Sequence, residues 1–157
     1  MTPKPTAYSL DTSGLLDGIE RYYPPATFPG LWERVDQLIL DGRLLMSEEA
    51  ISEAMYLDAA ARDWCAPRKD SIIVQTNQAI AAHVTGIVTK FHVWTGGTTN
   101  RADPFVIAVA LEHDAVVITG EKPGSIQNPK IPFVCNARGV ACTNFLGLVT
   151  RENWVFS

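Results

Sequence analysis

The chain has 157 residues and a net charge of −4, and hydrophobic residues make up 46% of it. This length fits one domain with its own core, so we expect residues 1–157 to form a single domain. The composition excludes a disordered or fibrous chain, and the acidic balance excludes a protein that holds nucleic acid by its overall field. Because no apolar run could span a bilayer and the N-terminus lacks a signal-peptide core, we expect a cytoplasmic protein with no membrane partner.

The first half of the chain predicts alternating strands and helices. Its strands are expected at Ala7–Leu10 and Leu44–Met46. Its helices are expected at Gly14–Arg21, at Leu31–Leu40 with Gly42 as the C-terminal cap, from Ser47 as N-cap to about Ala61, and at Ile72–Phe91. Residues 63–70 are expected to form a loop.

The second half continues the alternation. We expect a loop at Thr95–Asn100, a helix from the N-cap Asp103 to His113, strands at Ala115–Thr119 and Ile131–Val134, a helix at Phe145–Arg151 and an edge strand at Trp154–Phe156. Strands separated by helices predict a mostly parallel sheet covered on both faces, a single-domain three-layer α/β/α sandwich. In such sheets the ligand site lies at the carboxyl ends of the strands.

Four acidic residues are predicted to meet at that edge. Asp11 follows the first strand, Glu121 follows Ala115–Thr119 after one glycine, Asp103 precedes the helix that enters that strand, and Glu53 lies in the helix after the second strand. Four carboxylates in one place repel each other unless protons or divalent cations neutralise them. Hard cations such as Mg²⁺ and Mn²⁺ prefer such oxygen ligands.

Structural roles compete with this interpretation. Asp11 and Asp103 could each cap a helix, and Glu53 could belong to a solvated acidic face with Glu48 and Glu49. Asp114 precedes its strand and so lies at the wrong end of the sheet. The histidines and the three cysteines show no spacing typical of metal ligands.

Three stretches carry a resemblance to a known family. They are YSLDTSGLL (Tyr8–Leu16), SEEAISEAMY around Glu53, and ADPFVIAVALEHDAVVITGEK (Ala102–Lys122), and the closing IPFVCNARGVACTNFLGLVTREN agrees with them. The chain resembles PIN-like domains of the VapC-like toxin superfamily, most of all a PIN-like family of unknown function. The resemblance implies a five-stranded parallel sheet and a Mg²⁺- or Mn²⁺-dependent endoribonuclease, a hydrolase acting on RNA, with a small antitoxin protein as partner and a homodimer as a common assembly.

The same resemblance assigns the acidic cluster to Asp11, Glu53, Asp103 and Glu121, with Ser13 and Thr119 as supporting residues. Where the family usually has aspartate, this chain has Glu121. Arg101 and Lys122 are candidates for holding RNA phosphates, beside Lys130 and Arg138. Trp94 could stack on a base, although packing is the better interpretation. The alternatives are a non-catalytic PIN-like module that binds RNA or protein, and a flavodoxin-like nucleotide-binding domain whose glycine fingerprint is absent.

Overall fold

A central parallel sheet organises the protein, whose computed structural model describes residues 3–94 and 102–157. Its strands follow the order β3-β2-β1-β4-β5, and every described pairing is parallel. The strands are β1 (Ala7–Leu10), β2 (Leu44–Ser47), β3 (Ile73–Val74), β4 (Ala115–Ile118) and β5 (Cys142–Thr143). The predicted α/β class is therefore confirmed.

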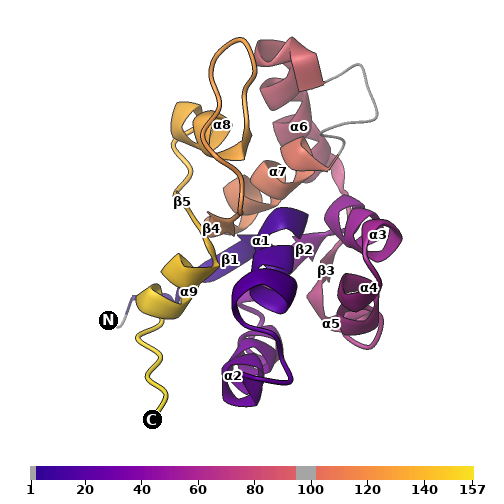
Figure 1. Ribbon diagram of the computed structural model, residues 1–157. Coiled ribbons are helices and arrows are strands. Elements are labelled where there is room, and N and C mark those ends of the chain that lie inside the picture. Colours follow the sequence, from indigo (N-terminus) through magenta and orange to yellow (C-terminus); the bar gives the residue numbers. More distant parts are fainter. Residues whose placement is uncertain (1–2, 95–101) are drawn as a thin grey trace.

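Helices cover both faces of this sheet. They are α1 (Thr12–Leu16), the π-helix η1 (Asp17–Tyr22), α2 (Pro29–Leu40), α3 (Glu48–Leu57), α4 (Ala59–Cys65), α5 (Lys69–Ile72), α6 (Gln78–Lys90), the 3₁₀-helix η2 (His92–Trp94), α7 (Asp103–His113), α8 (Ile131–Ala137) and α9 (Phe145–Arg151). In Figure 1, α6, α7 and α8 lie above the sheet, and α2, α4 and α9 lie below it. Among the described helices, none combines the length and apolarity needed to span a membrane.

The elements with clear local signals occur where they were expected. Helix α2 buries Leu31, Val35 and Leu38 on one face, and Gly42 follows it with φ +69°, a conformation that favours glycine. Ser47 caps α3, because its Oγ accepts a hydrogen bond from the backbone N–H of Ala50 at 3.0 Å. The helix α9 has the predicted bounds.

Three predicted helices are wrong in extent. The helix expected from Ser47 to Ala61 stops at Leu57, because Asp58 has extended backbone angles. The carboxylate of Asp58 caps the next helix, α4. Helix α4 runs to Cys65 and so occupies the start of the loop predicted at 63–70. The segment expected as one helix from Ile72 to Phe91 instead contains the end of α5 at Ile72 and the strand β3. Helix α6 starts at Gln78, and the side chain of Asn77 caps it by accepting a hydrogen bond from Ile80 N. The helix expected at Gly14–Arg21 starts earlier, at Thr12, and continues as a π-helix.

The strand predicted at Ile131–Val134 is also wrong, since these residues form α8 with Pro132 in its first turn. Asp103 is the first residue of α7 rather than its N-cap; Ala102 holds that position, and Asp103 makes no capping hydrogen bond. The segment Trp154–Phe156 forms no strand. The loop predicted at Thr95–Asn100 lies outside the described residues.

The register of β1 and β4 positions the functional edge. Leu10 pairs with Ile118, so Asp11 and Thr119 leave adjacent strands at the same level. The chain runs from β1 to β2 on one side, whereas β4 lies on the other side of β1. Such a switch in strand order opens a crevice at the carboxyl ends of the strands, where ligands bind in open α/β sheets. The core beneath it includes Ile107 and Val117, both fully buried.

Candidate functional site

Asp11 lies at the centre of the crevice. It occupies the N-cap position of α1 but makes no capping hydrogen bond with its side chain. Its Oδ2 instead accepts hydrogen bonds from the hydroxyls of Ser13 at 2.5 Å and Thr119 at 2.9 Å. The carboxylate is only 2% exposed, so these two hydroxyls fix its orientation in the absence of bulk water. Ser13 and Thr119, the two residues expected to support the acidic cluster, therefore both donate hydrogen bonds to Asp11.

Backbone amides fix the two hydroxyls in turn. Gly120 N donates to Ser13 Oγ at 2.9 Å, and Glu121 N donates to Thr119 Oγ1 at 3.1 Å. Each hydroxyl therefore accepts from an amide and has its own proton left for Asp11. The segment after β4 and the first turn of α1 are connected through one continuous hydrogen-bond network.

Asp103 is the second buried carboxylate of this edge. It is 4% exposed, and its Oδ2 has no hydrogen-bond partner among the described residues. Burial is the largest cause of its raised pKa, which reaches about 8. The negative charges of Asp11, Glu121 and Glu53 raise this pKa too, while the ammonium of Lys130 opposes them. A buried, unpaired carboxylate oxygen is costly and needs a function or a ligand to explain it.

The same neighbours act on Asp11. Burial raises its pKa to about 6, and the charges of Glu121 and Glu53 add to the rise. The hydrogen bonds from Ser13 and Thr119 lower it. The structure therefore brings Glu53 and Glu121 within electrostatic range of both Asp11 and Asp103.

The two glutamates are less buried than the two aspartates. Glu53 lies on α3, which α1 contacts through a hydrogen bond from Thr12 Oγ1 to Ala50 O at 3.3 Å. Glu121 Oε2 accepts from Ile131 N at 3.0 Å, so its side chain joins the end of β4 to the start of α8. Both glutamates are half-buried.

The four carboxylates do not form a compact set of metal ligands as they stand. Across residues 3–94 and 102–157, no three Asp, Glu, His or Cys side chains are grouped closely enough to hold an ion. The pKa shifts show that the carboxylates are close enough to affect the charge of Asp11 and Asp103, which is a weaker requirement than being close enough to share one metal ion. Coordination by more than two of these groups requires the half-buried glutamate side chains to move.

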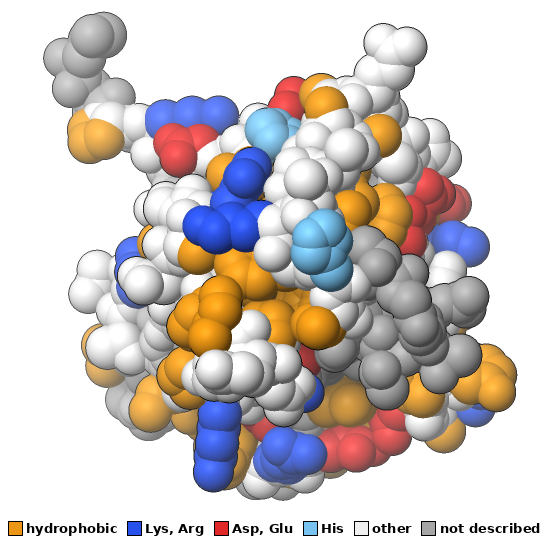
Figure 2. All heavy atoms as spheres, turned by 90° about the horizontal axis from the view of Figure 1, so that it is seen from above, with side chains coloured by type: hydrophobic (Ala, Val, Ile, Leu, Met, Phe, Trp, Pro, Cys, Tyr) orange, Lys and Arg blue, Asp and Glu red, His pale blue; other side chains and the backbone are white. Residues whose placement is uncertain are grey.

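Of the predicted RNA-contacting residues, the structure describes Lys122, Lys130 and Arg138. Arg101 lies outside the described residues, Lys122 is exposed, and Lys130 is half-buried near Asp103. On the face seen in Figure 2, the described Lys and Arg side chains are interspersed with hydrophobic and neutral ones. Trp94 is 5% exposed and donates from Nε1 to Pro129 O at 3.1 Å, so it packs against the segment after β4 and is not available to a base.

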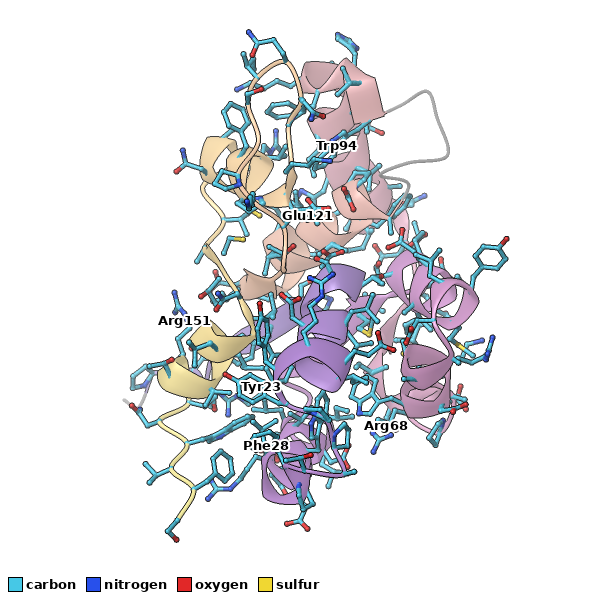
Figure 3. All side chains as sticks on the ribbon, viewed as in Figure 1. Tyr23, Phe28, Arg68, Trp94, Glu121 and Arg151 are labelled. Atoms are coloured by element: carbon cyan, nitrogen blue, oxygen red, sulfur yellow. The ribbon has the colours of Figure 1, made fainter. Side chains whose placement is uncertain are left out.

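A cleft of about 390 Å³ adjoins the acids. Thr119, Gly120 and Glu121 form one side of it, and Tyr22, Tyr23 and the start of α9 form the rest. Figure 3 labels Glu121 and Tyr23, which both line this cleft. Nothing in the sequence predicted the cleft or the buried Asp17, which lines the cleft and pairs with Arg21 at 2.9 Å.

Gly120 is required where the cleft meets the hydroxyl network. A Cβ at this position would lie 2.3 Å from Asp17 Oδ2 and 3.0 Å from the backbone oxygen of Ser13. No side chain fits there without moving both. The glycine between Thr119 and Glu121 was a signal that two parts of the site approach closely.

Comparison with known proteins agrees with this architecture. A model of the family described as Domain of unknown function (DUF4411) matches residues 8–156. The chain belongs to this family. No curated protein matches it. This member of DUF4411 is also similar to the solved structure of VapBC-1 from nontypeable Haemophilus influenzae, with a TM-score of 0.54 and 18% sequence identity, over 90% of this chain and 99% of that chain. At this identity the likeness concerns the fold, which is PIN-like.

Proposed function

We propose that this member of DUF4411 is a divalent-metal-dependent endoribonuclease. The observation that carries the proposal is Asp103 Oδ2, which is buried with no hydrogen-bond partner in the described part of the chain and lies within electrostatic range of Asp11 and two further carboxylates. Asp11, Asp103, Glu53 and Glu121 would be the catalytic, metal-binding group. An all-oxygen, anionic donor set suits Mg²⁺ or Mn²⁺ better than softer metals.

The residues fit such an ion chemically. Burial, and after it the charges of neighbouring carboxylates, raises the pKa values of both aspartates, and a bound cation would favour their ionised forms. Asp11 and Asp103 would be the fixed ligands, and Glu53 and Glu121 the adjustable ones. When bound, a divalent ion lowers the pKa of a coordinated water and neutralises the charge of the phosphodiester.

The chain's own groups would orient and select the substrate. Ser13 and Thr119 hold the Asp11 carboxylate in one direction, and Ile131 N holds one oxygen of Glu121. Lys122 and Arg101 would contact RNA phosphates as substrate-binding residues. Because the net charge is −4, such contacts would be local rather than a broad basic field.

We further propose that the protein is the toxin of a toxin–antitoxin pair, with a small antitoxin as partner. The likeness of the fold to VapBC-1 supports this part of the proposal. Co-expression with the product of a neighbouring small gene tests it. A stable complex in which cleavage is suppressed is expected, whereas full activity in the presence of that protein would contradict it.

The ribonuclease itself is tested with purified protein and single-stranded RNA. Cleavage is expected in Mg²⁺ or Mn²⁺, and none in EDTA. Asp11→Asn should abolish cleavage while leaving the fold intact, and Asp63→Asn, at an exposed position of α4, is the matched control. The proposal would be refuted if wild-type protein still cleaved RNA in EDTA and the Asp11→Asn variant still cleaved RNA in Mg²⁺ or Mn²⁺.

The second candidate is a non-catalytic PIN-like module that binds RNA or protein. The lack of a compact ligand group in the described part of the chain favours it. This candidate predicts binding without cleavage, and no effect of Mn²⁺ on thermal stability beyond that of matched NaCl.

A further inference from the structure

The cleft beside the acids has the features of a small-ligand site. Its volume of about 390 Å³ falls in the range of about 300–1,000 Å³ that is typical of such sites. It shares Thr119, Gly120 and Glu121 with the edge that carries the acids, and Thr119 itself donates to Asp11. A ligand bound there would lie directly next to the group that handles the phosphate in the proposed function.

Aromatic rings form the opposite wall. The ring of Tyr23 is held by Phe28 at 5.6 Å and Phe145 at 5.7 Å between centroids, so it is fixed in position. Tyr22, which ends the π-helix η1, is 61% exposed, and its ring centroid lies 6.3 Å from that of Tyr23. π-helical turns are rare and often occur at functional sites. Here the turn presents an uncovered aromatic face at the mouth of the cleft.

Glu121 is assigned to the metal in the proposed function, and the other polar groups of the cleft favour a neutral, hydrogen-bonding ligand. Asp17 is paired with Arg21, so it adds little unbalanced charge. Asn144 uses its Oδ1 to cap α9 through Gly147 N at 2.8 Å, and none of the described residues accepts a hydrogen bond from its Nδ2. That amide can donate to a carbonyl or ring nitrogen of a ligand. An exposed tyrosine and an amide donor are the groups that proteins use to recognise unstacked bases.

We infer that this cleft binds one unpaired nucleobase of an RNA strand, with Tyr22 stacking on the base. The inference rests on the proposed function, since a divalent ion held by the acids would neutralise the adjacent phosphate while the cleft holds the base. A single-stranded region is required, because a base within a duplex cannot enter a cleft and stack on a side chain. Tyr22 is then a substrate-binding residue rather than a catalytic one.

The test measures binding apart from cleavage. Fluorescence anisotropy follows a short labelled single-stranded oligoribonucleotide binding to Asp11→Asn protein in Mg²⁺, and Tyr22→Ala or Tyr22→Phe is added to this background. Tyr22→Ala should weaken binding about 10-fold, which corresponds to about 1.4 kcal/mol and lies within the range for base stacking. Tyr22→Phe should stay within about twofold, because it keeps the ring. Tyr56→Ala, which removes a tyrosine that is 85% exposed on α3, is the control and should have no effect.

An abasic oligonucleotide with the same phosphates separates base recognition from charge. Its affinity should be the same with Tyr22 and with Tyr22→Ala. Three results would each overturn the inference. They are equal RNA affinity with Tyr22 and with Tyr22→Ala, the same loss of affinity on the abasic strand as on RNA when Tyr22 is replaced by alanine, and no RNA binding at all. RNA cleavage by wild-type protein that is unchanged by Tyr22→Ala would refute only the base site. Binding that depends on Tyr22 without any cleavage would refute only the ribonuclease.

Discussion

Asp103→Asn offers a direct test of how the acidic edge affects folding. The wild-type carboxyl is buried, its Oδ2 has no partner among residues 3–94 and 102–157, and its pKa is raised from 3.8 to about 8. Asparagine has nearly the same shape but cannot ionise. The substitution therefore removes the charge while the packing around α7 is kept.

The sign follows from proton binding. Between pH 3.8 and about 8 the unfolded carboxyl is ionised and the folded one holds a proton, so unfolding releases a proton and stability falls as pH rises. The loss is about 1.4 kcal/mol per pH unit, so Asp103 accounts for about 2.5 kcal/mol between about pH 5.5 and 7.5. Asp11, with a pKa of about 6, adds less than about 1 kcal/mol over this range.

Urea unfolding in EDTA at these two pH values measures the effect. Wild type and Asp103→Asn should have similar free energies of unfolding at the lower pH, and the variant should be more stable by about 2.5 kcal/mol at the higher pH. Every other ionisable side chain is present in both proteins, so the difference between the two proteins reports on Asp103. Asp63→Asn should behave as wild type. The same pH dependence in wild type and Asp103→Asn would refute the reasoning.

Three further predictions concern the same edge. Gly14→Ala should lower the free energy of unfolding by about 1–3 kcal/mol in urea titrations, because the new Cβ would lie 2.6 Å from Ile118 O; unchanged stability would contradict the packing of α1 on β4. Ser13→Ala removes a hydrogen bond that lowers the pKa of Asp11, so the acid limb of the cleavage rate should move to higher pH, and an unmoved limb would contradict this role. Mn²⁺ at a hundredfold excess over its Kd should raise the free energy of unfolding by about 2.7 kcal/mol at neutral pH, whereas an equal effect of NaCl at matched ionic strength would contradict a localised site.

The central elements of the fold could be predicted because their signals are local. The apolar run of β4 and the apolar period of α2 are sufficient by themselves. The edge strands β3 and β5 have only two residues each, and pairing with a neighbouring strand defines them, which no local pattern reveals. The error at Ile131–Val134 was avoidable, since Pro132 and the helical spacing of Ile131, Val134 and Cys135 favour a helix.

The site, like the fold, has parts that the sequence predicts and parts that it does not. Asp11 and Thr119 could be placed because they directly follow strands that any parallel sheet brings together. Asp103 was expected in the site, but its helical position was off by one residue, because Ala102 carries no capping side chain to mark the boundary. The cleft depends on how η1 packs against α9, a contact between segments more than 100 residues apart, so the sequence contained no pattern for it.

The most direct test of the metal-dependent site is a crystal structure of the protein. The crystals are grown with Mn²⁺ at a pH above the pKa of Asp103, which is about 8. Anomalous scattering identifies the ion without reference to activity. We expect a peak within about 2.0–2.6 Å of carboxylate oxygens from both Asp11 and Asp103, with Glu53 or Glu121 turned toward it. Crystals of Asp103→Asn grown in the same way should lack the peak. A wild-type structure with no Mn²⁺ between these two aspartates, or with Mn²⁺ bound only elsewhere, would contradict the proposed metal-dependent ribonuclease.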